Sequence, residues 1–253
     1  MKKSLIIILL FSLLGCKSKI ATDHSNHKYL LALEKYTDSS RNRLIPVAIY
    51  GHLDKKLVSK TPIIFSHGYG GNKGGDYIED YTYLLETLAS KGYFVIRIRH
   101  ELKTDELLAM DEPLKITRMP NWKRGSENIG FVLNKMKEEY SSVNFDKLVL
   151  IGHSNGGDMS VLFAHQHPEL IHKLISLDNR RMDLPRTSKP KVYTLRSSDY
   201  PADEGVLPSD EEQKKFGITV QYTDIKHSSM DNDANEEERK YLTSKILEYL
   251  NEK

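Results

Sequence analysis

Residues 147–157 read KLVLIGHSNGG and constrain the fold more than any other stretch. The apolar run over 148–152 is typical of a strand buried on both faces, and residues 158–167 predict a helix. Gly152-His153-Ser154-Asn155-Gly156 therefore places G-x-S-x-G between a strand and a helix. On so tight a turn, only residues without a Cβ leave room for the neighbouring elements. The pattern predicts that the Ser154 hydroxyl projects from the sheet as a nucleophile.

The N-terminus differs from the rest of the chain. Met1-Lys2-Lys3 is basic, and residues 5–14 form an apolar stretch too short to span a bilayer as a permanent helix. Leu13-Leu14-Gly15-Cys16 resembles the lipobox of bacterial lipoproteins, whose cysteine is lipidated and becomes the mature N-terminus. The resemblance implies a signal peptide over 1–15, a lipid on Cys16 and a membrane-anchored place in the bacterial cell envelope, outside the cytoplasm. Since Cys16 is the only cysteine, no disulfide or thiolate nucleophile is expected.

The remaining chain predicts one domain. A length of 253 residues with 39% hydrophobic residues suits a single core, and a net charge of +2 gives no reason to expect nucleic acid as a partner. We expect a tether and irregular lead-in over 16–40 and a folded domain over 41–253. Strands are predicted at 44–50, 62–65, 93–99, 148–152, 174–178, 192–195 and 218–222, and helices at 76–90, 122–140, 158–167 and 236–250. This alternation predicts an α/β fold with a mostly parallel sheet, and Pro46 places the first of these strands toward an edge.

A second glycine-rich loop follows the strand at 62–65. Attack by a serine on a carbonyl creates an oxyanion, which fixed backbone N–H groups stabilise best. The expected donors are Asn155, directly after the nucleophile, and Tyr69 in the Ser66–Gly71 loop. A phosphate-binding loop is not expected, because neither G-x-x-x-x-G-K-[ST] nor G-x-G-x-x-G is present. The acids between 101 and 121 lack ligand spacing with histidines, so no metal is expected; this segment is predicted to cross the sheet and shape the site.

A serine needs a base, and the base needs an acid that fixes its tautomer. His227 is the histidine that follows the final strand and both main candidate acids, giving the order Ser, Asp, His. His67 and His153 are expected beside the site, and His100 in a structural hydrogen bond. Three acids remain open: Asp199, favoured by its place after the strand at 192–195; Asp178, at the end of the preceding strand; and Asp203.

These motifs resemble the α/β-hydrolase superfamily from Leu44 to His227. Residues 65–71 (FSHGYGG), 88–93 (LASKGY) and 152–157 (GHSNGG) are most similar to its branch of platelet-activating-factor acetylhydrolases, chlorophyllases and dienelactone-hydrolase-like proteins. The resemblance implies helices on both faces of the sheet, and in acetylhydrolases of this branch the acid takes the place of Asp178. The cysteine nucleophile of dienelactone hydrolases is replaced here by Ser154. The segment 177–191 is too short for a large lid domain.

The leading hypothesis is a cofactor-independent serine hydrolase that cleaves carboxylic esters through an acyl-enzyme. The substrate is expected to be a small-molecule or polymeric ester, because the site has no predicted lid. Two alternatives stay open. The same residues can hydrolyse amides or peptides, and a lipoprotein with this fold can act in binding alone.

Overall fold

The computed structural model describes residues 29–52, 61–73 and 80–252. The expected signal peptide, Cys16 and the first part of the tether lie outside these residues. In the described part of the chain, no helix combines the length and the apolar character needed to cross a membrane.

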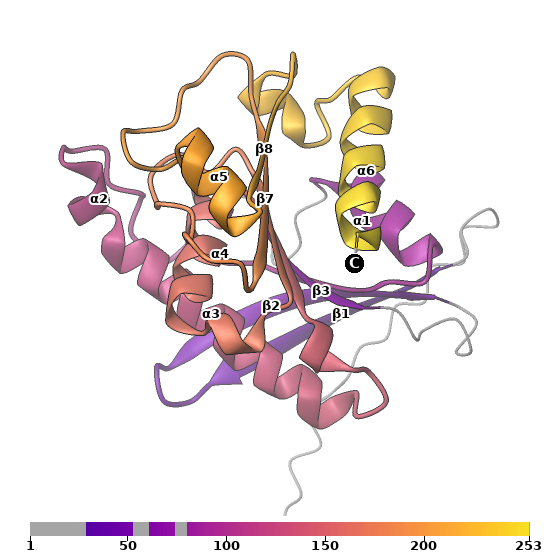
Figure 1. Ribbon diagram of the computed structural model, residues 1–253. Helices are drawn as coiled ribbons and strands as arrows, with labels where there is room; N and C mark the ends of the chain where they lie inside the picture. Colours follow the sequence, from indigo (N-terminus) through magenta and orange to yellow (C-terminus); the bar gives the residue numbers. More distant parts are fainter. Residues whose placement is uncertain (1–28, 53–60, 74–79, 253) are drawn as a thin grey trace, which may run out of the picture.

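A single eight-stranded sheet forms the centre of the molecule (Figure 1). In spatial order its strands are β1 (Tyr29–Asp38), β2 (Arg43–His52), β4 (Phe94–Ile98), β3 (Pro62–Ser66), β5 (Val149–His153), β6 (Lys173–Leu177), β7 (Lys191–Arg196) and β8 (Thr219–Tyr222). The pairs β1–β2 and β2–β4 are antiparallel, and every other pair is parallel. The carboxyl ends of β3, β5, β6 and β7 therefore meet at one edge of the sheet, which confirms the predicted mostly parallel arrangement.

Two features at the start of the sheet correct the sequence prediction. Residues 29–38 form the edge strand β1, so the irregular lead-in expected over 16–40 is wrong for these residues. β2, with Pro46, lies inside the sheet and not at its edge. The Pro46 carbonyl accepts from the Arg99 N–H at 2.9 Å, beyond the last paired residues, Val47 and Ile98. An N–H at position 46 would face β4 as well, where the paired residues of β2 and β4 have already ended. Proline is therefore tolerated, because its missing N–H removes no hydrogen bond between the paired residues.

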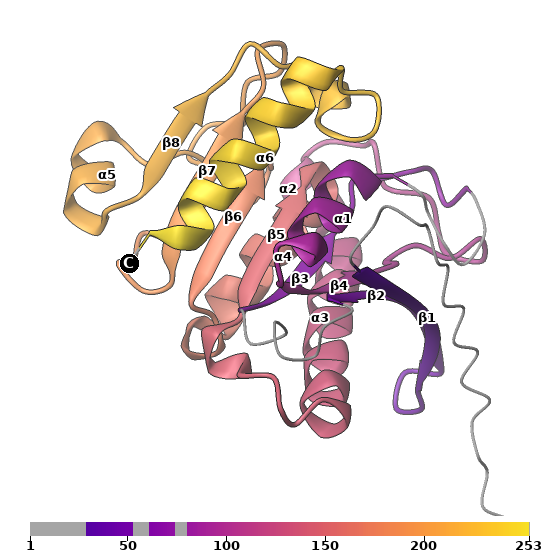
Figure 2. The ribbon, with the colours of Figure 1, turned by 90° about the vertical axis from the view of Figure 1, so that its right-hand side faces the viewer.

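Helices cover both faces of the sheet. Figures 1 and 2 show α1 (Thr82–Ser90) and α6 (Glu236–Asn251) on one face, with α3 (Met119–Glu139) and α4 (Ser154–Gln166) on the other. Two short helices, α2 (Leu114–Thr117) and α5 (Asp210–Phe216), and the 3-10 turns η2 (Phe145–Lys147), η3 (Pro168–Leu170) and η4 (His227–Met230) complete the described elements. α5 was not expected from the sequence; the Ser209 and Glu212 side chains cap its first turn.

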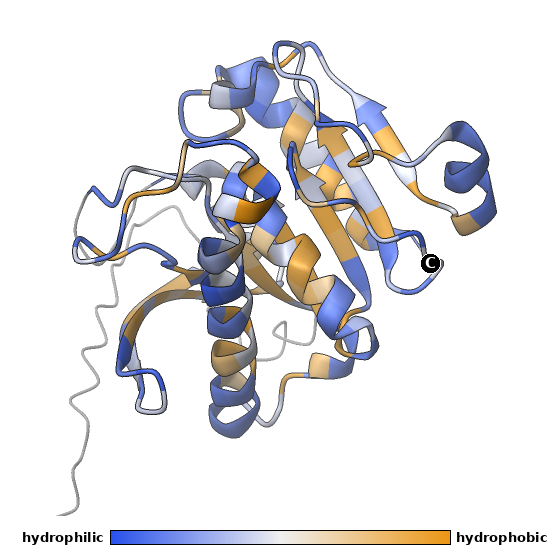
Figure 3. Cartoon of the chain, turned by 90° about the vertical axis from the view of Figure 1, so that its left-hand side faces the viewer, coloured by the Kyte–Doolittle hydropathy of each residue, from blue (hydrophilic) through white to orange (hydrophobic). Residues whose placement is uncertain are grey.

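Strand alternation divides the core into two layers. Ile63 and Phe65 of β3 pack with Leu88 of α1 and Ile246 of α6, whereas Ile64 packs on the side of α3 and α4. Figure 3 shows the hydrophobic residues gathered in the central strands and the hydrophilic ones on the outer surfaces of the helices. Residues 178–190, between β6 and β7, contain no helix, so no lid domain is inserted there.

Candidate active site

Ser154 lies at the sharp turn between β5 and α4. Its φ of 52° is in the left-handed region, where a serine is strained. The flanking glycines are required by close backbone approach: a Cβ on Gly156 would lie 2.3 Å from the His67 carbonyl oxygen, and one on Gly152 would lie 2.5 Å from the Gly156 carbonyl oxygen. The crowding predicted from G-x-S-x-G is therefore present, and it holds the serine at the carboxyl edge of the sheet.

His227 connects this serine to an acid. The His227 Nε2 atom lies 2.9 Å from Ser154 Oγ, and its Nδ1 atom lies 2.5 Å from Asp178 Oδ2. With Nδ1–H donated to the carboxylate, Nε2 is free to accept the serine proton. Residues from the ends of β5 and β6 and from the η4 turn thus form one continuous hydrogen-bonded series.

Asp178 is ionised in a buried position. Its side chain is fully buried, and its Oδ1 atom lies 2.8 Å from Arg196 Nη2 and accepts from the Ser197 N–H at 3.0 Å. Burial alone would raise the pKa of Asp178, but the His227 hydrogen bond, the Arg196 charge and the Ser197 N–H outweigh it and lower that pKa below its usual value. The carboxylate therefore stays charged and can stabilise a protonated imidazole.

The two other candidate acids do not contact the imidazole. Asp199 is exposed, and its Oδ1 atom accepts from the His227 backbone N–H at 2.7 Å. Asp203 instead forms an ion pair with Arg181. The preference for Asp199 based on spacing does not match this geometry: Asp199 holds the backbone of the histidine turn, while Asp178 holds its ring.

The glycine-rich loop after β3 lies against the serine. A Cβ on Gly68 would be 3.5 Å from the Ser154 Cβ, and the Tyr69 N–H has no acceptor among the described residues. Asn155 is the second residue of α4, where a backbone N–H has no acceptor within the helix. Both predicted oxyanion donors thus belong to segments next to Ser154, and neither N–H is engaged in a helical hydrogen bond.

Three buried side chains hold that loop in place, and the sequence indicated only one of them. His67 lies between the Gly68 carbonyl at its Nδ1 atom (2.7 Å) and the His100 N–H at its Nε2 atom (3.1 Å). Glu101 accepts from the Gly70 N–H at 3.1 Å. The Tyr81 hydroxyl accepts from the Gly68 N–H at 3.1 Å, which leaves it to donate to the His153 ring at 2.7 Å.

Burial keeps the two histidines that flank the site neutral. The pKa of His67 falls to about 3, through burial and then the Arg97 charge, and that of His153 also falls to about 3, through burial and then His227. Neither is therefore protonated near neutral pH. His100 lies 3.0 Å from Ser66 Oγ through its Nε2 atom, a structural hydrogen bond as expected.

The segment crossing from β4 fixes the residue after the nucleophile. Trp122 Nε1 donates to Asn155 Oδ1 at 2.8 Å, and Asn155 Nδ2 donates to Asn121 Oδ1 at 2.9 Å. The Leu108 N–H also donates to the Tyr69 hydroxyl at 3.1 Å. The predicted crossing segment, 101–121, thus contacts Tyr69 and Asn155 through Leu108 and Asn121, whereas Trp122 belongs to the part expected only as a helix. No local pattern identified Asn121 or Trp122 as supports of Asn155.

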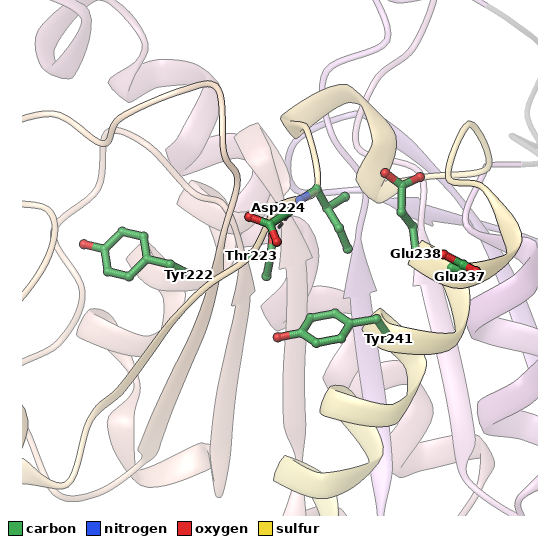
Figure 4. A pocket seen from close by; sticks show the side chains of 7 residues that line it. Tyr222, Thr223, Asp224, Glu237, Glu238 and Tyr241 are labelled. Atoms are coloured by element: carbon green, nitrogen blue, oxygen red, sulfur yellow. Dashed lines mark hydrogen bonds between the residues drawn. The ribbon is translucent and has the colours of Figure 1, made fainter.

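A separate hollow of about 430 Å³ lies between the end of β8 and α6 (Figure 4). It is lined by Tyr222, Thr223, Asp224, Ile225, Glu237, Glu238 and Tyr241 and includes none of Ser154, His227 and Asp178.

Within residues 29–52, 61–73 and 80–252, no three His, Cys, Asp or Glu side chains gather closely enough to hold a metal ion.

Many solved structures share this fold, although no protein-family model and no curated protein sequence matches the chain. A fungal esterase from Rhizomucor miehei superposes with a TM-score of 0.62 and 14% identity, over 88% of this chain and 82% of its own. The esterase Est22 gives 0.61 and 12%, over 88% and 81%. An S-formylglutathione hydrolase from Agrobacterium tumefaciens gives 0.58 and 10%, over 88% and 95%. The chain therefore has the α/β-hydrolase fold.

Proposed function

We propose that this protein is a serine hydrolase that cleaves carboxylic esters through an acyl-enzyme. The observation that carries the proposal is the continuous series Asp178–His227–Ser154, with separations of 2.5 and 2.9 Å at the carboxyl edge of the sheet. The esterases among the similar structures support the choice of esters.

In the first half of the reaction, Ser154 Oγ attacks the ester carbonyl carbon and its proton passes to His227 Nε2. The carbonyl oxygen becomes an oxyanion held by the N–H groups of Tyr69 and Asn155. The intermediate collapses, the bond to the leaving oxygen breaks, and the imidazolium returns its proton to that oxygen. The products are an alcohol and the acylated serine.

Water completes the cycle by the same route. His227 Nε2 takes a proton from the water as the water oxygen attacks the acyl carbon. The same two N–H groups stabilise the second oxyanion. The bond to Ser154 Oγ then breaks, and the proton returns to Oγ. A carboxylic acid leaves, and the enzyme regains its starting protonation state. No step uses a metal or an organic cofactor.

A fluorophosphonate probe tests the chemistry directly. We expect it to label the protein at Ser154, and labelling to disappear in Ser154→Ala. p-Nitrophenyl esters of increasing acyl length should be hydrolysed much faster than aminoacyl anilides. If the probe labels Ser154 but the protein hydrolyses only anilides and no ester, the protein is an amidase. No labelling in a folded protein would contradict catalysis altogether.

We also propose that the enzyme acts in the bacterial cell envelope, outside the cytoplasm, anchored to a membrane by a lipid on Cys16. The support is the sequence Leu13-Leu14-Gly15-Cys16 after a basic and apolar leader. In cells fed an alkyne-tagged fatty acid, the tag should appear on the wild type and be lost in Cys16→Ala. A tagged Cys16→Ala variant would refute lipidation at this residue.

A further inference from the structure

An arginine lies at the edge of the proposed site, two residues after Asp178. The Arg180 guanidinium carbon lies 4.3 Å from the centre of the Tyr200 ring, and that ring stands edge-on to the His227 imidazole at 5.7 Å. These two separations place the guanidinium no more than 10.0 Å from the imidazole centre. Tyr200 is 49% exposed, so the aromatic platform under the arginine is open to solvent.

The Arg180 charge has no counterion in the described part of the chain. Its neighbour Arg181 is paired with Asp203, whereas Arg180 forms no ion pair with a described carboxylate. Its Nε atom is also buried and has no hydrogen-bond partner among the described residues. A cation held on an aromatic face without a carboxylate retains its attraction for an anion.

Further positive charge lies close to Arg180. The pKa of Arg118 is lowered by burial and then by the charges of Arg181 and Arg180, with Asp158 and Glu112 offsetting part of the effect. Arg118 belongs to the segment that crosses the sheet, and its Nε atom donates to a backbone carbonyl of that segment. Two separate segments therefore contribute positive charge that acts on the surroundings of Arg180.

The loop that carries Arg180 is fixed in position. The Asp158 Oδ1 atom accepts from the Arg181 N–H at 3.0 Å and from the Met182 N–H at 2.8 Å. On the other side, the Arg180 carbonyl accepts from the Asp203 N–H at 3.0 Å. Because these bonds hold the backbone on both sides, little ordering is needed when a ligand binds, which favours recognition by this arginine.

We infer that Arg180, supported by the Tyr200 ring, binds a negatively charged group of the substrate. The inference rests on the proposed ester hydrolysis and names its substrate class: esters with a carboxylate or a similar anion a few atoms from the scissile carbonyl. Such a group strengthens binding of the substrate and is remote from the bond that breaks, so it lowers KM and leaves kcat nearly unchanged.

Matched esters test this inference. The p-nitrophenyl monoester of glutaric acid places a carboxylate on the acyl side, and p-nitrophenyl valerate is its neutral counterpart. The pair 4-butyryloxybenzoate and phenyl butyrate makes the same comparison on the alcohol side. We expect the wild type to favour the charged ester of at least one pair about 10-fold in kcat/KM, because the charged ester has the lower KM. This advantage should shrink as salt is added, because salt screens the attraction between the two charges.

Variants then assign the effect. Arg180→Gln should lose the preference for the charged ester and keep its turnover of the neutral one, which also shows that it is folded. Arg180→Lys should keep part of the preference, because the charge remains. Tyr222→Ala is the control: Tyr222 is another exposed tyrosine, located in the separate hollow of Figure 4, and its replacement should change neither ester.

The outcomes separate the two proposals. Turnover of the neutral esters with no advantage for either charged ester overturns the inference and leaves the proposed esterase intact. A preference that survives in Arg180→Gln also overturns it. If no ester of either pair is hydrolysed, the proposed function fails, and the inference that rests on it fails as well.

Discussion

Replacing Asp178 by asparagine tests which carboxylate orients the base. The Asp178 Oδ2 atom accepts a hydrogen bond from His227 Nδ1–H across 2.5 Å, and this leaves Nε2 free for the Ser154 hydroxyl at 2.9 Å. An asparagine amide facing the ring donates to Nδ1 instead, so the hydrogen moves to Nε2 and the ring can no longer accept the serine proton. Asp178→Asn should therefore lose about 10⁴-fold in kcat, or about 5 kcal/mol of transition-state stabilisation.

The matched variant is Asp199→Asn. Asp199 was the preferred acid on spacing, yet among the described residues its exposed carboxylate accepts a hydrogen bond only from the His227 backbone N–H. An asparagine Oδ1 atom can accept the same bond, so we expect a loss in kcat of less than about 10-fold. The difference between the two variants, about three orders of magnitude, measures the contribution of the ring contact.

Loss of folding must be separated from loss of chemistry. Arg196 is 2% exposed and is paired with Asp178 at 2.8 Å, so Asp178→Asn leaves a buried charge without its partner. Breaking a buried pair in this way costs about 3–5 kcal/mol of stability. The double variant Asp178→Asn/Arg196→Met removes the unpaired charge and should recover stability without recovering activity.

The assay is hydrolysis of p-nitrophenyl acetate under saturating conditions, scaled to the folded fraction from circular dichroism and urea unfolding. If Asp199→Asn loses as much activity as Asp178→Asn, the assignment of the acid is wrong. It is also wrong if folded Asp178→Asn keeps more than about a tenth of the wild-type kcat.

Three further predictions follow from the site. Gly156→Ala should destabilise the protein by about 3 kcal/mol or more in urea unfolding, because its Cβ meets backbone at 2.3 Å, while Gly130→Ala, where the nearest atom is a Phe163 ring carbon at 3.4 Å, should be neutral or slightly stabilising. Glu101→Gln should lower kcat about 10-fold, since the amide cannot accept as well from the loop N–H groups; wild-type kcat would refute this role. Because the pKa of His67 is lowered to about 3, the unfolded state binds its proton more tightly, so its contribution to stability is present above pH 6.5 and is lost as the pH falls toward 3. Between pH 6.5 and 5 the unfolding free energy of His67→Gln should fall about 2 kcal/mol less than that of the wild type.

The sequence predicted best where one physical requirement decided the structure. A glycine on each side of Ser154 is demanded by backbone contacts below 3 Å, and such contacts leave a local trace in the sequence. His227 could be found because it follows the final strand, and strand ends share one edge of a parallel sheet. β1 has no comparable pattern in the sequence. It is an edge strand that is only partly buried, so hydrophobic and polar residues do not alternate strictly along it, and its pairing with β2 could not be predicted.

The sequence could not separate Asp178 from Asp199 as the partner of His227, because both satisfy the same positional rule. Each follows a strand, β6 or β7, and the two strands are adjacent, so both side chains reach the edge where His227 lies. What separates them is burial and charge. The Asp178 side chain is fully buried, and Arg196 from the neighbouring strand compensates its charge. Compensation by a residue 18 positions further along the chain depends on strand register, and register is set by the packing of the whole sheet. The pattern that favours Asp178 as the partner of His227 is therefore its pairing with a buried arginine on the adjacent strand. This pairing becomes visible only once the register of β6 and β7 is known.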